Sequence, residues 1–399
     1  MKILVINAGS SSMKYQLMDM DGEKVLAKGN CERIGNGGHL EHKANGRQFD
    51  TDIPMPDHTV AFEVIKKALT EGEGKVIDDL SEITAIGHRV VQGGSSFSAS
   101  CLITDEVVEK VTQYIPLAPI HNPAGLRGIE AATAAFGKEI PQVAVFDTAF
   151  HQTMPEKAYM YGLPYEYYEK YGIRRYGFHG TSHRFVSQRC FELLGKPDGK
   201  GTRVITCHIG SGASIAAIKD GEVVDTSMGM TPLDGFMMST RCGSVDPAAV
   251  TFLMEKEGLT PAEMDNIMNK KSGMASLSGQ SPDDRDVIAA IEKGDARAKM
   301  AWDVRSYQIA KTIGGYLMAL GGADAIVLTA GSGENQYQLR KDILGYLAWL
   351  GVTMDDEAAH VRRQEIEISG KDSAIRVFVI PTDEELVIAR DTAAIVENL

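Results

Sequence analysis

Residues 3–17 read ILVINAGSSSMKYQL, and residues 204–218 read VITCHIGSGASIAAI. Each stretch is an apolar strand, a turn rich in Gly and Ser, and a second strand. Glycine permits close backbone approach and positive φ, and successive N–H groups in such turns form an anion-binding concavity. Because a strand follows each turn, the pattern differs from Rossmann and Walker A loops, which open a helix. One copy alone could be a plain hairpin, but two copies at matched strand ends predict a duplicated phosphate-binding hairpin.

Composition sets the class of protein. With 399 residues, 43% hydrophobic and 24% charged, the chain is predicted to be globular, with two domains. A net charge of −13 argues against nucleic acid or anionic membranes as partners. The five cysteines form no CxxC and no metal-like spacing, which favours reduced thiols. No leader and no apolar run of about 18–20 residues is visible, so we expect a cytoplasmic protein.

Strand-like and helix-like segments alternate along the chain, which favours an α/β fold. We place the domain boundary near residue 150, after the apolar strand candidate 143–146. A long helix is predicted from about 296 to 320 by its apolar spacing. Residues 35–60, which contain Gly, His and Pro, are predicted to be a loop-rich insertion.

Helix ends carry their own signals. Asn122-Pro123 resembles a cap followed by proline at the first helical position, and Gly137 would end that helix. Residues 260–263 read TPAE, which predicts a capping box. Thr382 and Glu385 show the same spacing, so Glu385 is predicted to cap the last helix and Glu384 to remain for a ligand.

Polar residues follow the predicted strands where they end. Asn7, Arg89 and Asp147 each follow an apolar strand, and the segments 331–335 and 382–385 follow two more. Ligands of α/β sheets bind outside the carboxyl ends of the strands. The polar groups together therefore predict one cleft.

Two arginines stand in glycine-flanked turns with small or apolar neighbours. Arg89 lies in GHRVVQGG, residues 87–94, and Arg241 lies in STRCG, residues 239–243. Arginine is usually a solvated surface cation. The crowding by glycine indicates instead that these two guanidinium groups point into a cleft and bind carboxylate or phosphate through paired hydrogen bonds.

Residues 174–183 read RRYGFHGTSH and form the densest polar segment. His179 and His183 lie four residues apart, a spacing found in metal pairs, but no Glu or Cys ligand stands in register. His183 is therefore interpreted as structural at a helix start. His179 is the better candidate for stabilising charge on a transferring group, and Asp147 is a second candidate because it follows a buried strand.

The motifs resemble those of the acetate kinase family, within the superfamily of acetate and sugar kinases, Hsp70 and actin. The resemblance covers essentially the whole chain. It rests on NAGSSSMKY (7–15), GHRVV (87–91), APIHNPAG (118–125), VFDTAFHQTMP (145–155), RRYGFHGTSH (174–183), DTSMGMTPLDG (225–235), TRCG (240–243), GSGEN (331–335) and PTDEELVIA (381–389).

The resemblance implies a fold and an activity. The fold would be α/β, with two duplicated ribonuclease H-like (actin-like ATPase) domains and the active-site cleft between them. The domains would span 1–150 and 151–383, with the helix 384–399 packing back on the first. The activity would be reversible, magnesium-dependent transfer of phosphate between ATP and acetate, giving acetyl phosphate and ADP, typically by a homodimer.

The resemblance also assigns residues, position by position. Asp147, His179 and Arg241 would be catalytic, with Asp147 as acid/base or orienting group. Asn7 and Glu384 would bind Mg²⁺ or Mn²⁺, and Arg89 would bind the carboxylate substrate. The methyl group would contact Val91, Ile120, Phe178 and Pro232. The nucleotide would be held by Lys14, His208, Ile209, Gly210, Ser211, Gly212, Asp283, Asp284, Arg285, Gly331, Ser332, Gly333, Glu334 and Asn335.

The chain departs from the family pattern near the phosphates and the nucleotide. The departures are Gln92, Ser211, Ser239, Ser244, Ala330 and Ser332. Three alternatives therefore stay open: a propionate or other short-chain acid kinase, a phosphoryl donor such as pyrophosphate, and a nucleotide switch of the actin or Hsp70 type. A single methylene in an apolar pocket changes specificity only about 10–200-fold, so the sequence does not settle the acid.

Overall fold

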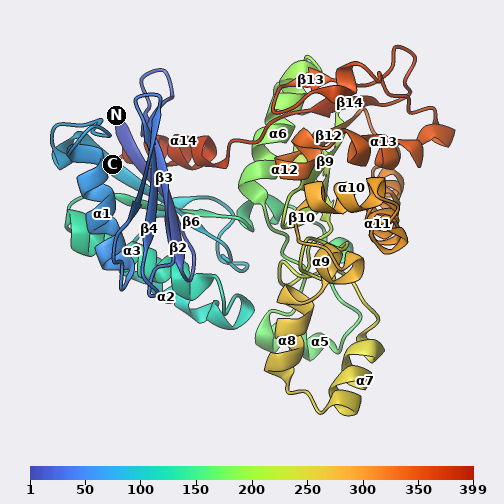
Figure 1. Ribbon diagram of the computed structural model, residues 1–399, viewed down its shortest axis with the longest axis horizontal. Helices are drawn as coiled ribbons and strands as arrows, with labels where there is room; N and C mark the ends of the chain where they lie inside the picture. Colours follow the sequence, from blue (N-terminus) through green and yellow to red (C-terminus); the bar gives the residue numbers. More distant parts are fainter. The chain divides into compact units, whose positions relative to one another are not determined.

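The computed structural model describes residues Met1–Leu399, which form two compact units (Figure 1). Unit 1 contains Met1–Phe150 together with Asp383–Leu399, and unit 2 contains His151–Thr382. Each unit is built on one mixed sheet.

Unit 1 has an eight-stranded sheet in the order β5-β4-β3-β2-β1-β6-β8-β7. Its strands are β1 (Lys2–Ala8), β2 (Ser12–Asp19), β3 (Lys24–Glu32), β4 (His39–Ala44), β5 (Arg47–Asp52), β6 (Ile83–Val90), β7 (Cys101–Leu102) and β8 (Gln142–Phe146). Its helices are α1 (His58–Thr70), α2 (Asp105–Gln113), α3 (Asn122–Phe136) and α14 (Glu384–Val396).

Alternation along β1 builds two cores in unit 1, because successive side chains of a strand point to opposite faces. Leu4 and Ile6 pack with Phe62 of α1 and Ala132 of α3. Ile3 and Val5 pack on the other face with residues of α14, including Ile388 and Ala389. The last helix of the chain therefore completes the core begun by the first strand.

Unit 2 has a six-stranded sheet in the order β11-β10-β9-β12-β14-β13. Its strands are β9 (Arg203–Ile209), β10 (Ala213–Lys219), β11 (Glu222–Thr226), β12 (Ala325–Thr329), β13 (Ile366–Glu367) and β14 (Arg376–Val379). Its helices are α4 (Glu156–Tyr159), α5 (Tyr165–Tyr171), α6 (Gly180–Leu193), α7 (Pro247–Glu257), α8 (Pro261–Lys270), α9 (Gly273–Ser278), α10 (Asp284–Glu292), α11 (Ala296–Leu320), α12 (Ala330–Asn335) and α13 (Tyr337–Gly345).

The two sheets repeat one arrangement. In unit 1 the order β3-β2-β1-β6-β8 has antiparallel pairs up to β1 and parallel pairs beyond it. In unit 2 the order β11-β10-β9-β12-β14 has the same directions. The predicted α/β class and its duplication are thereby confirmed.

The prediction of a loop-rich insertion over residues 35–60 is wrong. The structure forms a hairpin of β4 and β5 that extends the sheet from β3. Asn45 and Gly46 both have positive φ, 54° and 73°, as a two-residue turn of type I′ requires. Leu40, His42 and Ala44 alternate inward on β4, so both the alternation and the Asn-Gly pair could have revealed the hairpin.

Two helix starts also differ from prediction. The last helix begins after Asp383, whose carboxylate accepts a hydrogen bond from Leu386 N–H at 2.9 Å, so Thr382 and Glu385 do not form its cap. Asn122 is the first residue of α3 and its side chain does not cap the helix. The predicted capping box at Thr260 and Glu263 and the long helix α11 are both present.

Candidate active site

The first hairpin places an amide opposite an ammonium group. Asn7 on β1 pairs in register with Lys14 on β2. The turn between the strands is closed by Gly9 N–H, which donates to Ser12 O at 2.7 Å. His58 Nε2 lies 2.8 Å from Gly9 O and ties the turn to the start of α1. The turn is therefore held from both sides, as a fixed set of backbone donors requires.

Arg89 and Asp147 form a fork-to-fork ion pair at the ends of two adjacent parallel strands. Arg89 Nε and Nη2 donate to the two carboxylate oxygens of Asp147 at 2.8 and 2.7 Å. The Asp147 side chain is 1% exposed and that of Arg89 is 19% exposed. Burial alone lowers the pKa of Arg89, but attraction to Asp147 outweighs this and raises the pKa. The guanidinium is thus a fixed cation that keeps some exposure to solvent.

Glu384 adds a carboxyl group to this charge cluster of unit 1. Burial raises the pKa of Glu384 to about 7; repulsion from Asp147 and Glu385 adds to the rise, while Arg89 and Lys14 oppose it. Burial is therefore the main reason that the charged form of Glu384 is disfavoured, and a bound cation would favour that charged form. The amide oxygen of Asn7 and the carboxylate of Glu384 are oxygen ligands of the type that Mg²⁺ prefers.

The loop after β6 is held by Asn122, which the sequence analysis predicted to be a helix cap. Asn122 Nδ2 donates to Gln92 O at 3.0 Å, and Gln92 N–H donates to Asn122 Oδ1 at 3.1 Å. This reciprocal pair fixes the backbone that follows Arg89. Val91 is half-buried in this loop, whereas Ile120 is 42% exposed.

The second hairpin places an imidazole opposite a hydroxyl. His208 on β9 pairs in register with Ser214 on β10. Gly210 N–H donates to Gly212 O at 3.1 Å, and Ser239 N–H donates to Ser211 O at 3.3 Å. The turn is thereby linked to the segment that carries Arg241.

His179 and Arg241 meet at Gly212. A Cβ atom at Gly212 would lie 3.2 Å from Arg241 Nη1 and 3.3 Å from His179 Nε2. His179 precedes α6 with a φ of 58°, and its ring stacks on that of His208 at 4.1 Å between centroids. Arg241 Nη1 also donates to Pro232 O at 3.1 Å. The absence of a side chain at residue 212 is what lets the two donors converge.

A pocket of about 590 Å³ opens beside this hairpin within unit 2. Of the predicted nucleotide residues, it is lined by Gly210, Ser211, Asp283, Asp284, Arg285, Gly331, Ser332 and Asn335. Five further residues line the pocket: Ser239, which the sequence showed only as a departure from the family pattern, and Pro282, Gln336, Arg362 and Arg363, which the sequence analysis did not single out. The pocket thus joins the turn, the start of α10 and the segment after β12.

The remaining predicted nucleotide residues lie outside the pocket lining. His208, Ile209, Gly212, Gly333 and Glu334 are not among its lining residues, and Lys14 belongs to unit 1. Glu334 Oε1 accepts from Ala330 N–H at 2.8 Å and from Thr382 N–H at 3.1 Å. Residues 331–335 belong to the short helix α12.

Asp284 and Phe178, two of the predicted site residues, are buried. Asp284 accepts from Arg305 Nη1 at 2.7 Å and from the Ser332 hydroxyl at 2.6 Å, which links α10, α11 and α12. Phe178, predicted to contact the methyl group, is 1% exposed, and Pro232 is half-buried.

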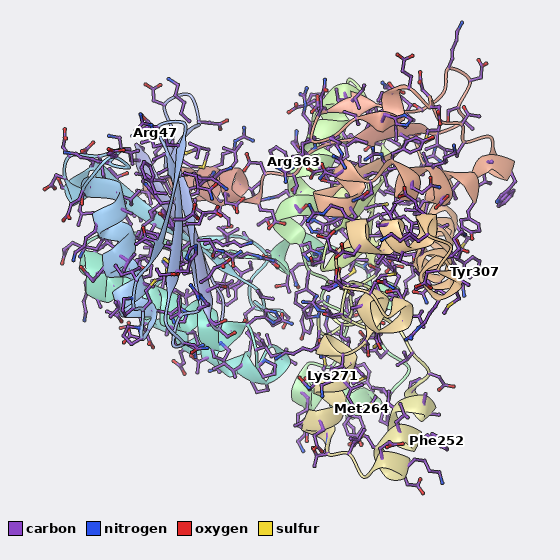
Figure 2. All side chains as sticks on the ribbon, viewed as in Figure 1. Arg47, Phe252, Met264, Lys271, Tyr307 and Arg363 are labelled. Atoms are coloured by element: carbon purple, nitrogen blue, oxygen red, sulfur yellow. The ribbon has the colours of Figure 1, made fainter.

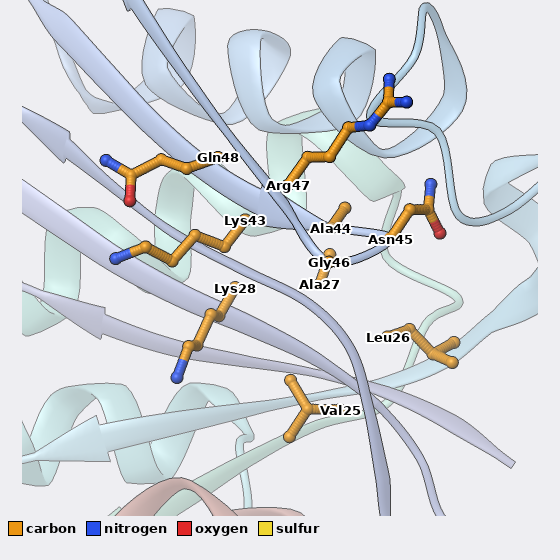
Figure 3. A pocket seen from close by; sticks show the side chains of 10 residues that line it. All are labelled: Val25, Leu26, Ala27, Lys28, Lys43, Ala44, Asn45, Gly46, Arg47 and Gln48. Carbon is orange, nitrogen blue, oxygen red and sulfur yellow. The ribbon is translucent and has the colours of Figure 1, made fainter.

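Another hollow, of about 400 Å³, lies on unit 1 away from these residues (Figure 3). It is lined by strands β3 to β5 and the turn at Asn45 and Gly46. Two of its cations are paired: Lys43 with Glu41 at 2.6 Å, and Arg47 with Glu73 at 3.1 Å. None of the predicted site residues lines it.

These features define an α/β protein with duplicated sheets, a glycine-rich turn on each, and arginine and histidine donors suited to anions. The chain belongs to the acetokinase family, whose model matches residues 2–390. It is 53% identical to an acetate kinase of Halothermothrix orenii, with 100% of both chains covered.

Two solved structures are similar over nearly the whole chain. The crystal structure of Porphyromonas gingivalis acetate kinase matches with a TM-score of 0.94 and 48% identity, covering 99% of each chain. The structure of a propionate kinase from Francisella tularensis matches with a TM-score of 0.92 and 40% identity, covering 98% of this chain and 99% of that one. Among the helices, none has the length and apolar content needed to cross a membrane.

Proposed function

We propose that the protein is an acetate kinase, which transfers the γ-phosphoryl group of ATP to acetate and catalyses the reverse reaction. The observation that carries this is the convergence of Arg241 Nη1 and His179 Nε2 on Gly212, beside a nucleotide-sized pocket. Phosphoryl transfer needs positioning and charge stabilisation more than covalent chemistry, and a guanidinium with an imidazole at a phosphate turn supplies both.

Unit 1 supplies the acceptor side of the reaction. By analogy with side-chain carboxyls, whose pKa is about 4, acetate is ionised at pH 7. It therefore needs no base before it attacks phosphorus. Arg89 binds the carboxylate, and Asp147 orients Arg89 by accepting two hydrogen bonds from it. Replacing Asp147 with Asn should change the acetate KM and leave the shape of the pH–rate profile unchanged; a limb of the profile that vanishes in Asp147→Asn would refute the orienting role.

Unit 2 supplies the donor side. The nucleotide occupies the pocket that runs from Gly210 and Ser211 to Arg285. The backbone N–H groups of the turn and the Arg241 guanidinium face the phosphates, where developing charge is stabilised. Phe178 and Pro232 are the residues that unit 2 would offer to the methyl group, and Val91 and Ile120 are those that unit 1 would offer.

Asn7 and Glu384 are the residues that would hold Mg²⁺. Their oxygens suit a divalent cation, which would also offset the cost of burying the charged Glu384 carboxylate. When bound, the cation neutralises charge on the phosphates of the nucleotide. The role of this chain is to present the deprotonated Glu384 carboxylate and to keep Lys14 opposite Asn7.

The functional form is a homodimer joined through unit 2. Helix α7 has no buried residue, although its Phe252 and Leu253 are apolar and are 57% and 40% exposed. Tyr307 and Phe252 stand on the surface of unit 2 (Figure 2). A second copy covering this surface explains the exposure. Light scattering should give a dimer mass for the wild type and a monomer mass for Phe252→Asp; a monomeric wild type would exclude the dimer.

The activity is tested by trapping the acyl phosphate with hydroxylamine across acetate, propionate and butyrate, each with ATP, GTP or pyrophosphate. We expect the highest kcat/KM with acetate and ATP. Nucleotide hydrolysis without acyl hydroxamate would replace the kinase by a nucleotide switch. Product with pyrophosphate alone would reassign the donor.

The second candidate is a propionate kinase. It is favoured by the 40% identity shared with the Francisella tularensis protein of that name, over 98% of this chain and 99% of that one. A kcat/KM for propionate above that for acetate in the same assay would select it. Val91→Ala would then test the assignment of Val91 to acid binding, because the smaller side chain leaves more space for a longer acid.

A further inference from the structure

Four side chains of unit 2 form an unbroken hydrogen-bonded chain that ends at His179. Thr206 Oγ1 on β9 lies 2.7 Å from Nδ1 of His183 on α6. Nε2 of His183 lies 2.8 Å from Ser214 Oγ on β10, and Ser214 Oγ lies 2.8 Å from Nδ1 of His179. We call Thr206, His183 and Ser214 the relay.

Because the relay is buried, a donor and an acceptor can be assigned to each of its hydrogen bonds. Thr206, His183 and Ser214 are each 0% exposed. A buried hydroxyl proton without an acceptor costs about 1–3 kcal/mol, more than an unused lone pair on the same oxygen. Burial, with the neighbouring His151 and His208 rings, also holds the pKa of His183 well below its ordinary value, so His183 is neutral.

The proton positions follow from Thr206 onward. The Thr206 hydroxyl makes its side-chain hydrogen bond with His183 Nδ1, so its proton goes there and Nδ1 accepts. A neutral His183 then carries its proton on Nε2 and donates it to Ser214 Oγ. The Ser214 proton is left with one acceptor, Nδ1 of His179. In the opposite direction, the Thr206 proton would be buried without an acceptor.

We propose that the relay holds His179 as a neutral imidazole with its proton on Nε2, which makes Thr206, His183 and Ser214 positioning residues for phosphoryl transfer. A doubly protonated His179 would direct a second N–H at Ser214 Oγ and leave the Ser214 proton without an acceptor. Nε2 is the nitrogen on the side of Gly212 and Arg241. The inference rests on the proposed function for its chemical meaning, while the tautomer itself does not depend on it.

The relay separates the tasks of the two donors at Gly212. Arg241 contributes the positive charge, and His179 contributes a fixed hydrogen-bond donor to a phosphoryl oxygen. No proton needs to enter or leave His179 during the reaction. Donors fixed in advance cost no reorganisation when charge develops on the transferring group.

The tautomer is measured directly by ¹⁵N NMR of the full-length protein labelled on its histidines, with His179→Gln used to assign the signals. At pH 7 we expect His179 to show a protonated Nε2 and an unprotonated Nδ1. A doubly protonated ring, or a proton on Nδ1, would overturn the proposal even in a fully active enzyme.

Ser214→Ala breaks the relay at its last link. We expect mixed protonation states at His179 and a kcat lower by about 10–100-fold, the loss typical of partners that orient a functional group, with the acetate KM nearly unchanged. Ser187→Ala is the matched control, because this buried serine of α6 donates to the Arg184 carbonyl and does not contact the relay. An unchanged His179 tautomer in Ser214→Ala would refute the relay, whereas a wild type without acyl kinase activity would refute only the proposed function.

Discussion

The two hairpins share a backbone plan and differ in the side chains that they carry. The first turn runs from Gly9 to Ser12 and the second from Gly210 to Gly212, so the second is one residue shorter. At the same register, the first pairs Asn7 with Lys14 and the second pairs His208 with Ser214. The backbone of the turn is therefore shared, and the side chains at the strand ends differ as the proposed function requires, with metal and acceptor assigned to one unit and phosphoryl transfer to the other.

The largest expected loss of activity follows from replacing Arg241, which lies beside the second hairpin. Arg241→Ala removes the cation beside Gly212 and should lower kcat about 10³-fold or more, the value typical of an arginine in phosphoryl transfer. Arg127→Ala, an exposed arginine of α3, serves as the control. A loss below about threefold for Arg241→Ala would contradict the role given to the second hairpin.

Acid should lower the free energy of unfolding of both units. Burial lowers the pKa of His88 to about 4 in the folded state, while the unfolded value is 6.5. The unfolded state therefore binds the proton more tightly, and stability is lost as pH falls from about 6.5 to about 4. The loss from His88 is roughly 3 kcal/mol, and His183 acts in the same direction in unit 2. Urea unfolding of wild type and His88→Asn across this range measures it, and equal pH slopes would refute the contribution of His88.

One glycine from each turn tests whether crowding is specific to the second turn. Gly212→Ala would place a methyl group 3.2 Å from Arg241 Nη1 and 3.3 Å from His179 Nε2. Displacing these donors should lower kcat by about 10–100-fold, since an error near 1 Å can cost about 10²-fold. Gly9→Ala meets only Ser12, chiefly its hydroxyl oxygen at 2.9 Å, which can rotate away. Steady-state kinetics that show equal losses would remove the distinction between the turns.

The smallest effect concerns the β4–β5 hairpin, which unit 2 lacks. Gly46 has a φ of 73°, and a Cβ atom there meets nothing within 4 Å. Gly46→Ala should therefore cost about 1 kcal/mol from backbone strain alone and leave kcat unchanged. Thermal unfolding with parallel activity assays checks this; a change in kcat would show that the extension takes part in the reaction.

Several features that depend on residues close together in the sequence were predicted correctly. The paired hairpins and the box at Thr260 depend on residues close in the chain, and the structure contains them. The β4–β5 hairpin had an equally local signal in Asn45-Gly46, so its omission was an error of reading. The last helix begins after its cap, Asp383, whereas the Thr382 hydroxyl donates to Ser182 of α6, a contact that sequence spacing does not reveal.

The hydrogen bonds that hold the site residues in place could not be predicted from the sequence. His183 was interpreted as structural, but the sequence did not reveal that it links Thr206 with Ser214, which lies 31 residues away. Asn122 was given to a helix cap, yet it fixes the loop after Arg89 through Gln92. Both roles depend on contacts between distant elements, which no motif spacing records.

The proposed division of roles between the two units is tested most directly by comparing the kinetic constants of Arg89→Ala with those of Arg241→Ala. Arg89→Ala should raise the acetate KM at least about tenfold, since it removes a charge-assisted contact to the carboxylate, and leave the ATP KM nearly unchanged. Arg241→Ala should lower kcat and leave both KM values within a few-fold. If both variants changed the same constant to the same extent, the assignment of acceptor binding to the first unit and phosphoryl stabilisation to the second would be wrong.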